Sequence, residues 1–177
     1  MTHYNHGLLT GWGLGLKVVA VLGHKKSGKT RLATMLIRAL KEMNYKVASA
    51  KHVYHANFSI DQPGKDSWKH REAGANPIII VSSEEVAIIL RDKRVETLSD
   101  LVKMAGDSDV LVLEGFHGLL KENDEVIKIA LIKNAEDLDT MKGEIVATFE
   151  NLNESGVYRL PEEFPQLFKL VLDKMSC

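Results

Sequence analysis

The segment "GHKKSGKT", residues 23–30, follows the apolar run "KVVAVL" and constrains the fold more than any other part of the chain. It has the spacing G-x-x-x-x-G-K-[ST], in which glycines let successive backbone N–H groups point at phosphate oxygens and the following helix adds the positive end of its dipole. The motif needs a strand before it and a helix after it. We therefore expect a strand over residues 17–22 and a helix from Lys29, where apolar residues recur at helical spacing as far as Met43.

Strand and helix patterns alternate along the rest of the chain. "NYKVASAKH" is typical of a turn and a second strand, which completes the βαβ unit that builds parallel sheets. "DVLVLEGF" is a continuous apolar run ending in a carboxylate, as in strands buried on both faces. The alternation predicts the α/β class: a three-layer α/β/α fold of the P-loop nucleoside triphosphate hydrolase type, with a mainly parallel central sheet. Its other elements are expected as strands at "EVIKIALI", "EIVATF" and "GVYRL", a helix between Thr97 and Gly106, and a closing helix from Phe164 to Met175.

Two segments depart from this alternation. Residues 53–75 are polar and contain glycine and proline, which predicts a long loop with a short helix near Ser67 to Ala73. "NPIIIVSSEEVAIIL" has two apolar runs separated by "SSEE" and predicts either a hairpin or two adjacent strands. A loop as long as residues 53–75 tends to be functional in a compact domain.

Length and composition narrow the class of protein. A chain of 177 residues suits one domain, so we expect a single nucleotide-binding domain over residues 15–177. Before it, residues 1–14 are expected as a flexible arm, and the alternative is a poorly placed start of the sequence. With 23 Lys and Arg against 24 Asp and Glu, the chain has no basic surplus for a nucleic-acid backbone. Its first apolar run is shorter than the roughly 20 residues that cross a bilayer, and the one cysteine, Cys177, indicates a reducing compartment. We expect a cytoplasmic protein with neither nucleic acid nor a membrane as partner.

The glycine motif assigns roles within a nucleotide site. Lys29 is expected to reach the β- and γ-phosphates, and the hydroxyl of Thr30 to be one ligand of a magnesium ion. The whole set expected to bind the nucleotide is Gly23, His24, Lys25, Lys26, Ser27, Gly28, Lys29, Thr30 and Arg31.

A magnesium ion held by one hydroxyl and the phosphates needs a carboxylate from a neighbouring strand end. Glu114, at the end of "DVLVLEG", is the candidate, and the alternative is a strand-end residue solvated at the rim. The charged segment "DQPGKDSWKHREAGA" offers two more carboxylates. If it folds over the triphosphate as switch segments do, Asp61 joins the metal ligands and Asp66 joins Lys29 in catalysis. The alternative for this segment is a solvated charged loop.

Four segments in the same order resemble the molybdopterin-guanine dinucleotide biosynthesis protein B family, MobB: "GHKKSGKT", "VASAKHVYH", "DQPGKDSWKHREAGA" and "VLVLEGF". The resemblance implies a fold similar to dethiobiotin synthetase, in which a glutamate before a glycine at a strand end ligates magnesium. It implies binding of GTP with Mg²⁺, weak hydrolysis, a homodimer, and assistance to the guanylyltransferase MobA, which attaches GMP to molybdopterin. By position it places Asp61 and Asp66 near the metal and phosphates, and the strands of "PIIIV" and "VAIIL" at the dimer interface.

The chain also departs from the family pattern. The phenylalanine-lysine pair after the strand-end glutamate is here Phe116-His117, and the guanine signature N-K-x-D is missing, since "IKNAEDLD" has its letters in another order. A preference for guanine therefore rests on the resemblance. The sequence favours a GTP-binding accessory protein of molybdenum-cofactor biosynthesis with weak Mg-dependent GTPase activity. The alternative is a P-loop small-molecule kinase or ligase that uses ATP.

Overall fold

The computed structural model describes residues 15–55, 57–141 and 143–177, and these form two compact units. The first unit contains residues 15–52 and 96–177, and the second is Val53–Val95. The arm expected over residues 1–14 lies outside the described residues. That residues 15–177 form a single domain stays a prediction.

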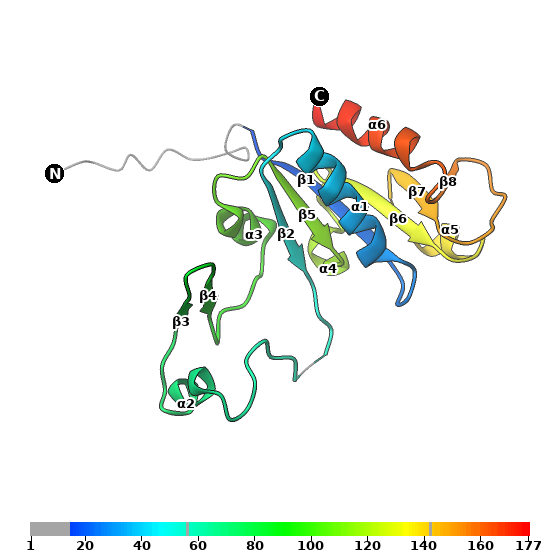
Figure 1. The fold of residues 1–177 in the computed structure, drawn as a ribbon. Coiled ribbons are helices and arrows are strands. Elements are labelled where there is room, and N and C mark those ends of the chain that lie inside the picture. Colours follow the sequence, from blue (N-terminus) through cyan, green and yellow to red (C-terminus); the bar gives the residue numbers. More distant parts are fainter. Residues whose placement is uncertain (1–14, 56, 142) are drawn as a thin grey trace. The chain divides into compact units, whose positions relative to one another are not determined.

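A six-stranded sheet forms the centre of the first unit, and all its strand pairings are parallel (Figure 1). The order in the sheet is β2-β5-β1-β6-β7-β8. The strand β5 therefore lies between β1 and β2, although it comes much later in the chain. The strands are β1 (Lys17–Gly23), β2 (Val47–Lys51), β5 (Val110–Glu114), β6 (Ile127–Ile132), β7 (Ile145–Thr148) and β8 (Val157–Arg159).

Alternate residues of the central strands point to two separate hydrophobic cores. Val19 and Val21 pack with α1 (Lys29–Glu42) and α6 (Phe164–Met175) on one face of the sheet. On the other face, Val18, Ala20 and Leu22 pack with α3 (Leu98–Ala105) and α4 (His117–Leu120). A short α5 (Asp137–Thr140) follows β6. Helices on both faces of a parallel sheet confirm the predicted three-layer α/β/α architecture. In the part of the chain that the structure describes, no helix combines the length and apolarity needed to cross a membrane.

The helix α3 lies between Thr97 and Gly106, as the sequence predicted. The Thr97 hydroxyl accepts a hydrogen bond from the Asp100 backbone N–H, and the Asp100 carboxylate accepts one from the Thr97 backbone N–H. This reciprocal capping box satisfies two N–H groups that the helix start leaves unpaired. The hydrogen bonds from Thr97 hold the pKa of the Asp100 carboxyl below its ordinary value. Gly106 follows the helix with φ 59°, a backbone angle that favours glycine.

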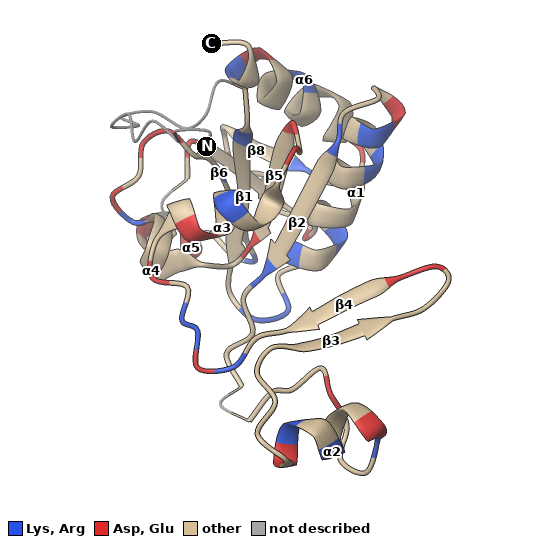
Figure 2. Ribbon diagram, turned by 90° about the vertical axis from the view of Figure 1, so that its left-hand side faces the viewer, with Lys and Arg blue, Asp and Glu red and all other residues tan. Residues whose placement is uncertain are grey.

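The second unit contains α2 (Asp66–Glu72) and the antiparallel hairpin of β3 (Ile78–Val81) and β4 (Val86–Ile89). The short helix expected within residues 53–75 is confirmed, and of the two alternatives for the apolar pair the hairpin is correct. Both strands lack charged side chains, and the acidic residues Glu84 and Glu85 are in the turn that joins them (Figure 2).

Candidate nucleotide site

The loop between β1 and α1 depends on two glycines because neighbouring atoms occupy the space of a side chain. A Cβ at Gly23 would lie 2.5 Å from the Ser27 hydroxyl and 2.7 Å from the Leu131 carbonyl oxygen. At Gly28 a Cβ would lie 2.5 Å from the Phe149 ring, and φ there is +92°, which favours glycine. Both glycines of the motif are therefore required by the packing around the loop.

The loop presents polar groups that lack a partner within the described protein. The Ser27 hydroxyl is buried and has no hydrogen bond from the described residues. At the start of α1, Gly28 caps the helix without a side-chain acceptor, so the first backbone N–H groups remain available. A buried orphan hydroxyl beside an uncapped start of a long helix fits an anion such as a phosphate.

Lys29 folds back over the loop. Its ammonium group donates to the His24 backbone carbonyl at 2.6 Å, so the side chain links the two ends of the segment from residue 24 to residue 29. Partial burial lowers the pKa of Lys29, while the charge of Glu114 raises it and that of Lys51 lowers it further. A phosphate anion in the loop would stabilise the charged ammonium that burial disfavours.

The two predicted metal ligands of the first unit are in direct contact. The Thr30 hydroxyl donates to Glu114 Oε1 at 2.7 Å. The register of the sheet explains a third partner, since Lys51 at the end of β2 is paired with Glu114 at the end of β5. The Lys51 ammonium donates to Glu114 Oε1 at 2.7 Å and to Thr30 Oγ1 at 3.1 Å. Lys51 thus bridges the two oxygens that we expected to bind magnesium.

Sequence reasoning missed Lys51 as a site residue. A lysine at the carboxyl end of a predicted strand was the available signal, because the carboxyl ends of parallel strands meet at one edge of the sheet. Which strand lies beside β2 depends on strand order, which the sequence does not specify. The hydroxyl and carboxylate oxygens of Thr30 and Glu114 match the hard ligands that Mg²⁺ prefers, with phosphate and water oxygens completing six positions. The residues present therefore fit this metal.

One histidine lies in the loop and contacts α5, and another begins α4. His24 Nε2 lies 3.5 Å from Asp137 Oδ1, and the other oxygen of Asp137 accepts from the Lys133 backbone N–H. His117, at the start of α4, has its pKa lowered by burial and then by the positive charges of His24 and Lys29. The site therefore combines a positive loop with a histidine whose surroundings favour the neutral ring.

The remaining loop residues lie at the surface. Lys25, Lys26 and Arg31 are exposed, and Lys26 has φ 66°. The Arg31 guanidinium lies over the Phe149 ring, 4.4 Å from its centroid. Phe149 therefore contacts two members of the predicted nucleotide site, Gly28 and Arg31.

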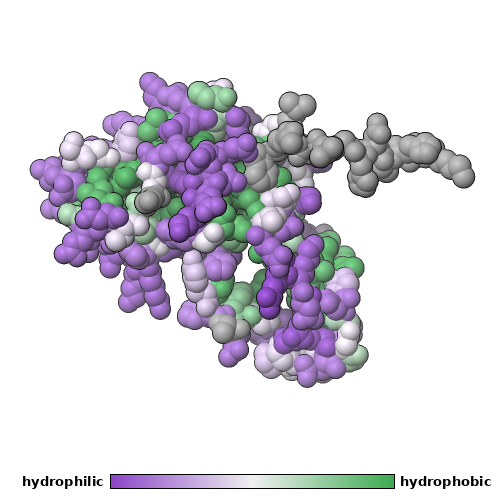
Figure 3. Space-filling model, turned by 180° about the vertical axis from the view of Figure 1, so that it is seen from behind, coloured by the Kyte–Doolittle hydropathy of each residue, from purple (hydrophilic) through white to green (hydrophobic). Residues whose placement is uncertain are grey.

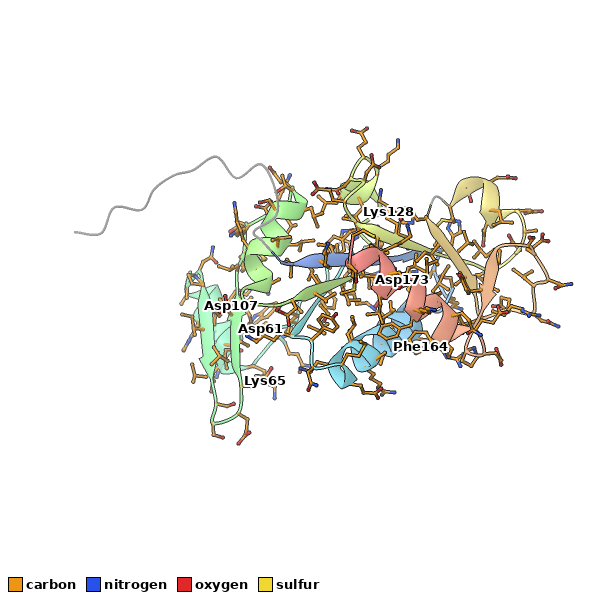
Figure 4. The ribbon with its side chains drawn as sticks, turned by 90° about the horizontal axis from the view of Figure 1, so that it is seen from above. Asp61, Lys65, Asp107, Lys128, Phe164 and Asp173 are labelled. Carbon is orange, nitrogen blue, oxygen red and sulfur yellow. The ribbon has the colours of Figure 1, made fainter. Side chains whose placement is uncertain are left out.

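Asp61 and Asp66 belong to the second unit, and their roles in the site stay predictions. Asp61 is buried within that unit, where its Oδ1 accepts from the Ser67 hydroxyl at 2.7 Å and from the Gln62 backbone N–H at 3.0 Å. Asp66 is exposed and pairs with Lys69 at 2.7 Å. Asp61 and Lys65, both labelled in Figure 4, precede α2 in the chain. These contacts give Asp61 a role in holding the start of this helix.

Comparisons with known proteins identify the family of this chain. The family model described as "Molybdopterin guanine dinucleotide synthesis protein B" matches residues 18–151. A molybdopterin-guanine dinucleotide biosynthesis adapter protein of Haemophilus influenzae is 32% identical over 103 residues, 57% of this chain and 57% of that protein. The adapter protein of Escherichia coli is 31% identical over 124 residues, 67% of each chain. The aligned part thus spans little more than half the length of the Haemophilus relative.

Solved structures give the same result. The crystal structure of a molybdopterin-guanine biosynthesis protein B has a TM-score of 0.62 at 26% identity and covers 88% of this chain and 98% of that one. Bacillus subtilis MobB has a TM-score of 0.67 at 21% identity, covers 89% of this chain and 97% of its own, and supports the fold alone. Because the family model matches about three quarters of the residues, the chain belongs to the MobB family.

Proposed function

We propose that this protein binds GTP with Mg²⁺ and acts as an adapter in the biosynthesis of molybdopterin guanine dinucleotide. In this role it assists the guanylyltransferase MobA, which attaches GMP to molybdopterin, and molybdopterin itself is a further candidate partner. The observation that carries the nucleotide part is the contact of Thr30 with Glu114 beside a loop whose Ser27 hydroxyl is buried without a partner. Membership of the family supports the adapter role.

We expect hydrolysis of the bound nucleotide to be weak. Transfer of a phosphoryl group to water needs positive charge on the transferred group and a residue that orients the water. In the first unit, Lys29 supplies charge at the loop, and Lys51 becomes available to the phosphates only once it leaves Glu114. Arg71, a candidate for added charge, stacks over Trp68 in the second unit at 3.9 Å from the ring centroid. The site is therefore better suited to hold a triphosphate than to cleave it.

The position of Lys51 is incompatible with a metal ion bound to Thr30 and Glu114. Its ammonium group contacts the same two oxygens that would bind magnesium, so it has to leave them before they serve as metal ligands. We propose that Lys51 exchanges these contacts for phosphate oxygens when the nucleotide is bound, because an ammonium group beside a divalent cation would be repelled.

We further propose that the protein is a cytoplasmic homodimer formed through the β3–β4 hairpin. Hydrophobic side chains on both strands are exposed: Ile79 60%, Ile80 41%, Val81 69%, Val86 61% and Ile88 60%. Figure 3 shows hydrophobic residues at the surface of this unit. An uncovered apolar hairpin with free edges is prone to non-specific pairing, and a second copy of the chain would cover it.

Isothermal titration calorimetry with GTP and ATP, each with and without Mg²⁺, tests the nucleotide proposal. We expect GTP to bind more tightly when Mg²⁺ is present, and Lys29→Ala to remove most of the affinity while the circular dichroism spectrum stays unchanged. Equal GTP affinity in Lys29→Ala would rule out the phosphate loop as the binding site. Preferential binding of ATP with phosphate transfer to a small acceptor would indicate the kinase or ligase alternative, which family membership does not favour.

A pull-down with purified guanylyltransferase tests the adapter proposal separately. We expect the enzyme to be retained by the immobilised protein in the presence of GTP and Mg²⁺. Loss of retention in Lys29→Ala would show that the complex needs the nucleotide. Absence of retention under every nucleotide condition would contradict the adapter role without affecting the nucleotide site.

A further inference from the structure

The chain lacks the N-K-x-D signature, so the residues that recognise the base have to be found elsewhere. Pockets that bind small molecules have volumes of about 300–1,000 Å³. One such hollow, of about 500 Å³, lies beside the start of α1. It is lined by Arg31, residues 149–151 and residues 159–162.

This hollow adjoins the phosphate loop directly. Arg31 follows Thr30 in the chain, and the Phe149 ring packs so closely on Gly28 that a Cβ there would lie 2.5 Å from it. Both residues line the hollow. A nucleotide with its phosphates in the loop therefore has this space next to its sugar and base.

The walls of the hollow have the chemistry that holds a flat ring. The planar guanidinium of Arg31 lies 4.4 Å from the centroid of Phe149, and Leu160 and Pro161 add apolar surface. Nucleic-acid bases stack on aromatic rings and on arginine planes, and such stacking does not discriminate strongly between bases. Discrimination has to come from polar groups at the rim.

The turn after β7 fixes the backbone at this rim. Thr148 is fully buried; its hydroxyl donates to the Ile132 carbonyl at 2.9 Å and accepts from the Glu150 backbone N–H at 3.0 Å. The Thr148 carbonyl accepts from the Leu160 backbone N–H at 2.8 Å, which ties the two lining segments together. The Glu150 side chain therefore starts from a held backbone position although the side chain itself is exposed.

The hydrogen-bonding edge of guanine explains why a carboxylate matters here. Guanine presents two adjacent donors, N1–H and the 2-amino group, and a carboxylate accepts from both. Adenine presents an acceptor at N1 and lacks the 2-amino group. Near the hollow, Arg159 and Glu163 pair with each other at 3.2 Å, whereas no lysine or arginine of the described residues forms a salt bridge with Glu150. 

We propose that this hollow takes the base of the bound nucleotide, and that the Glu150 carboxylate accepts from the guanine N1–H and 2-amino groups. The proposal rests on the proposed nucleotide-binding function. It supplies the base-reading carboxylate that the sequence motifs do not identify.

Affinities of GTP, ITP and ATP with Mg²⁺, measured by calorimetry, test the proposal. ITP keeps the phosphates, the ribose and N1–H of the purine but lacks the 2-amino group. We expect the native protein to prefer GTP over ITP by about tenfold, as for one hydrogen bond to a charged group. In Glu150→Gln, which keeps the side-chain size, the preference should fall to about one. Glu154→Gln, an exposed carboxylate outside the hollow, serves as the control and should retain the preference.

The outcomes separate this proposal from the one on which it rests. An unchanged ratio of GTP to ITP affinity in Glu150→Gln would overturn the role of Glu150. If Glu162→Gln loses the preference and Glu150→Gln keeps it, the base-reading carboxylate is Glu162, which also lines the hollow. Equal affinities for GTP, ITP and ATP in the native protein would overturn base reading in the hollow while leaving nucleotide binding intact. Failure of the native protein to bind any triphosphate would overturn both proposals.

Discussion

At the scale of single residues, the site is organised around one carboxylate. Glu114 Oε1 accepts from Thr30 and from Lys51 at the same time, and each donor comes from a different element. The sequence identified Thr30 through the motif and Glu114 through the end of an apolar run. It did not identify Lys51, because its contact with Glu114 depends on β2 lying beside β5, and that neighbour relation is set by the whole sheet.

Opposite changes in magnesium dependence are expected from the two partners of this contact. Glu114→Gln removes a charged ligand and should raise the Mg²⁺ concentration at which GTP binding is half-maximal. Lys51→Met removes the competing ammonium group and should lower it, with a change of severalfold in each direction. A titration of Mg²⁺ at fixed GTP, followed by calorimetry, measures both. Lys46→Met, just before the opposite end of β2, is the matched control. A change of the same sign in Lys51→Met and Glu114→Gln would contradict the competition between Lys51 and the metal.

His117 provides a prediction about pH. Burial and the positive charges of His24 and Lys29 lower its pKa in the folded protein, so we expect NMR titration of its ring to give a value below the ordinary one of about 6.5. The unfolded chain then takes up this proton at a higher pH than the folded one. The contribution of His117 to the free energy of unfolding is therefore complete above about pH 6.5 and decreases as the pH falls towards the folded pKa. A measured pKa at or above the ordinary value would contradict the described surroundings.

At the scale of elements, local patterns predicted most of the strands and helices. The apolar runs before residues 23 and 114 formed β1 and β5, and the periodic positions after Lys29 and Phe164 formed α1 and α6. These predictions succeeded because buried strands and amphipathic helices carry their own hydrophobic signature. The paired apolar runs of residues 78–90 left two alternatives open, since both place the same residues in strands.

The capping box of α3 gives a prediction for one element. Thr97→Ala removes the hydroxyl that accepts from the Asp100 backbone N–H, so we expect the free energy of unfolding to fall by about 1 kcal/mol in urea denaturation. Thr97→Ser keeps the oxygen and should retain most of the stability. Equal stabilities for the alanine and serine variants would contradict a capping role for the hydroxyl.

At the scale of the whole molecule, the predicted class of fold is confirmed, but the order of the strands could not be read from the sequence. The chain shows where strands occur, whereas the pairing of β1 with β5 and β6 depends on crossover connections. Composition also did not predict the division into two units, because the unit Val53–Val95 is recognised only by the contacts among its residues.

Association through the hairpin is testable at this scale. Ile88 is 60% exposed on β4, and Ile88→Lys places a charge on the proposed interface. We expect the molar mass from light scattering to change from that of a dimer towards that of a monomer. Ser83→Lys, in the turn between β3 and β4, introduces the same charge outside the strands and should remain dimeric. A monomeric native protein would contradict the proposed homodimer.

The position of β5 between β1 and β2 has a consequence for synthesis on the ribosome. Both sheet neighbours of β1 are made after it, and β2 also waits for β5, so neither early strand has a hydrogen-bonding partner when it emerges. Thr30 and Lys51 likewise meet Glu114 only after residue 114 has been added. A nucleotide stabilises only a site that already exists. A nucleotide that binds there therefore stabilises the chain only after β5 has been added.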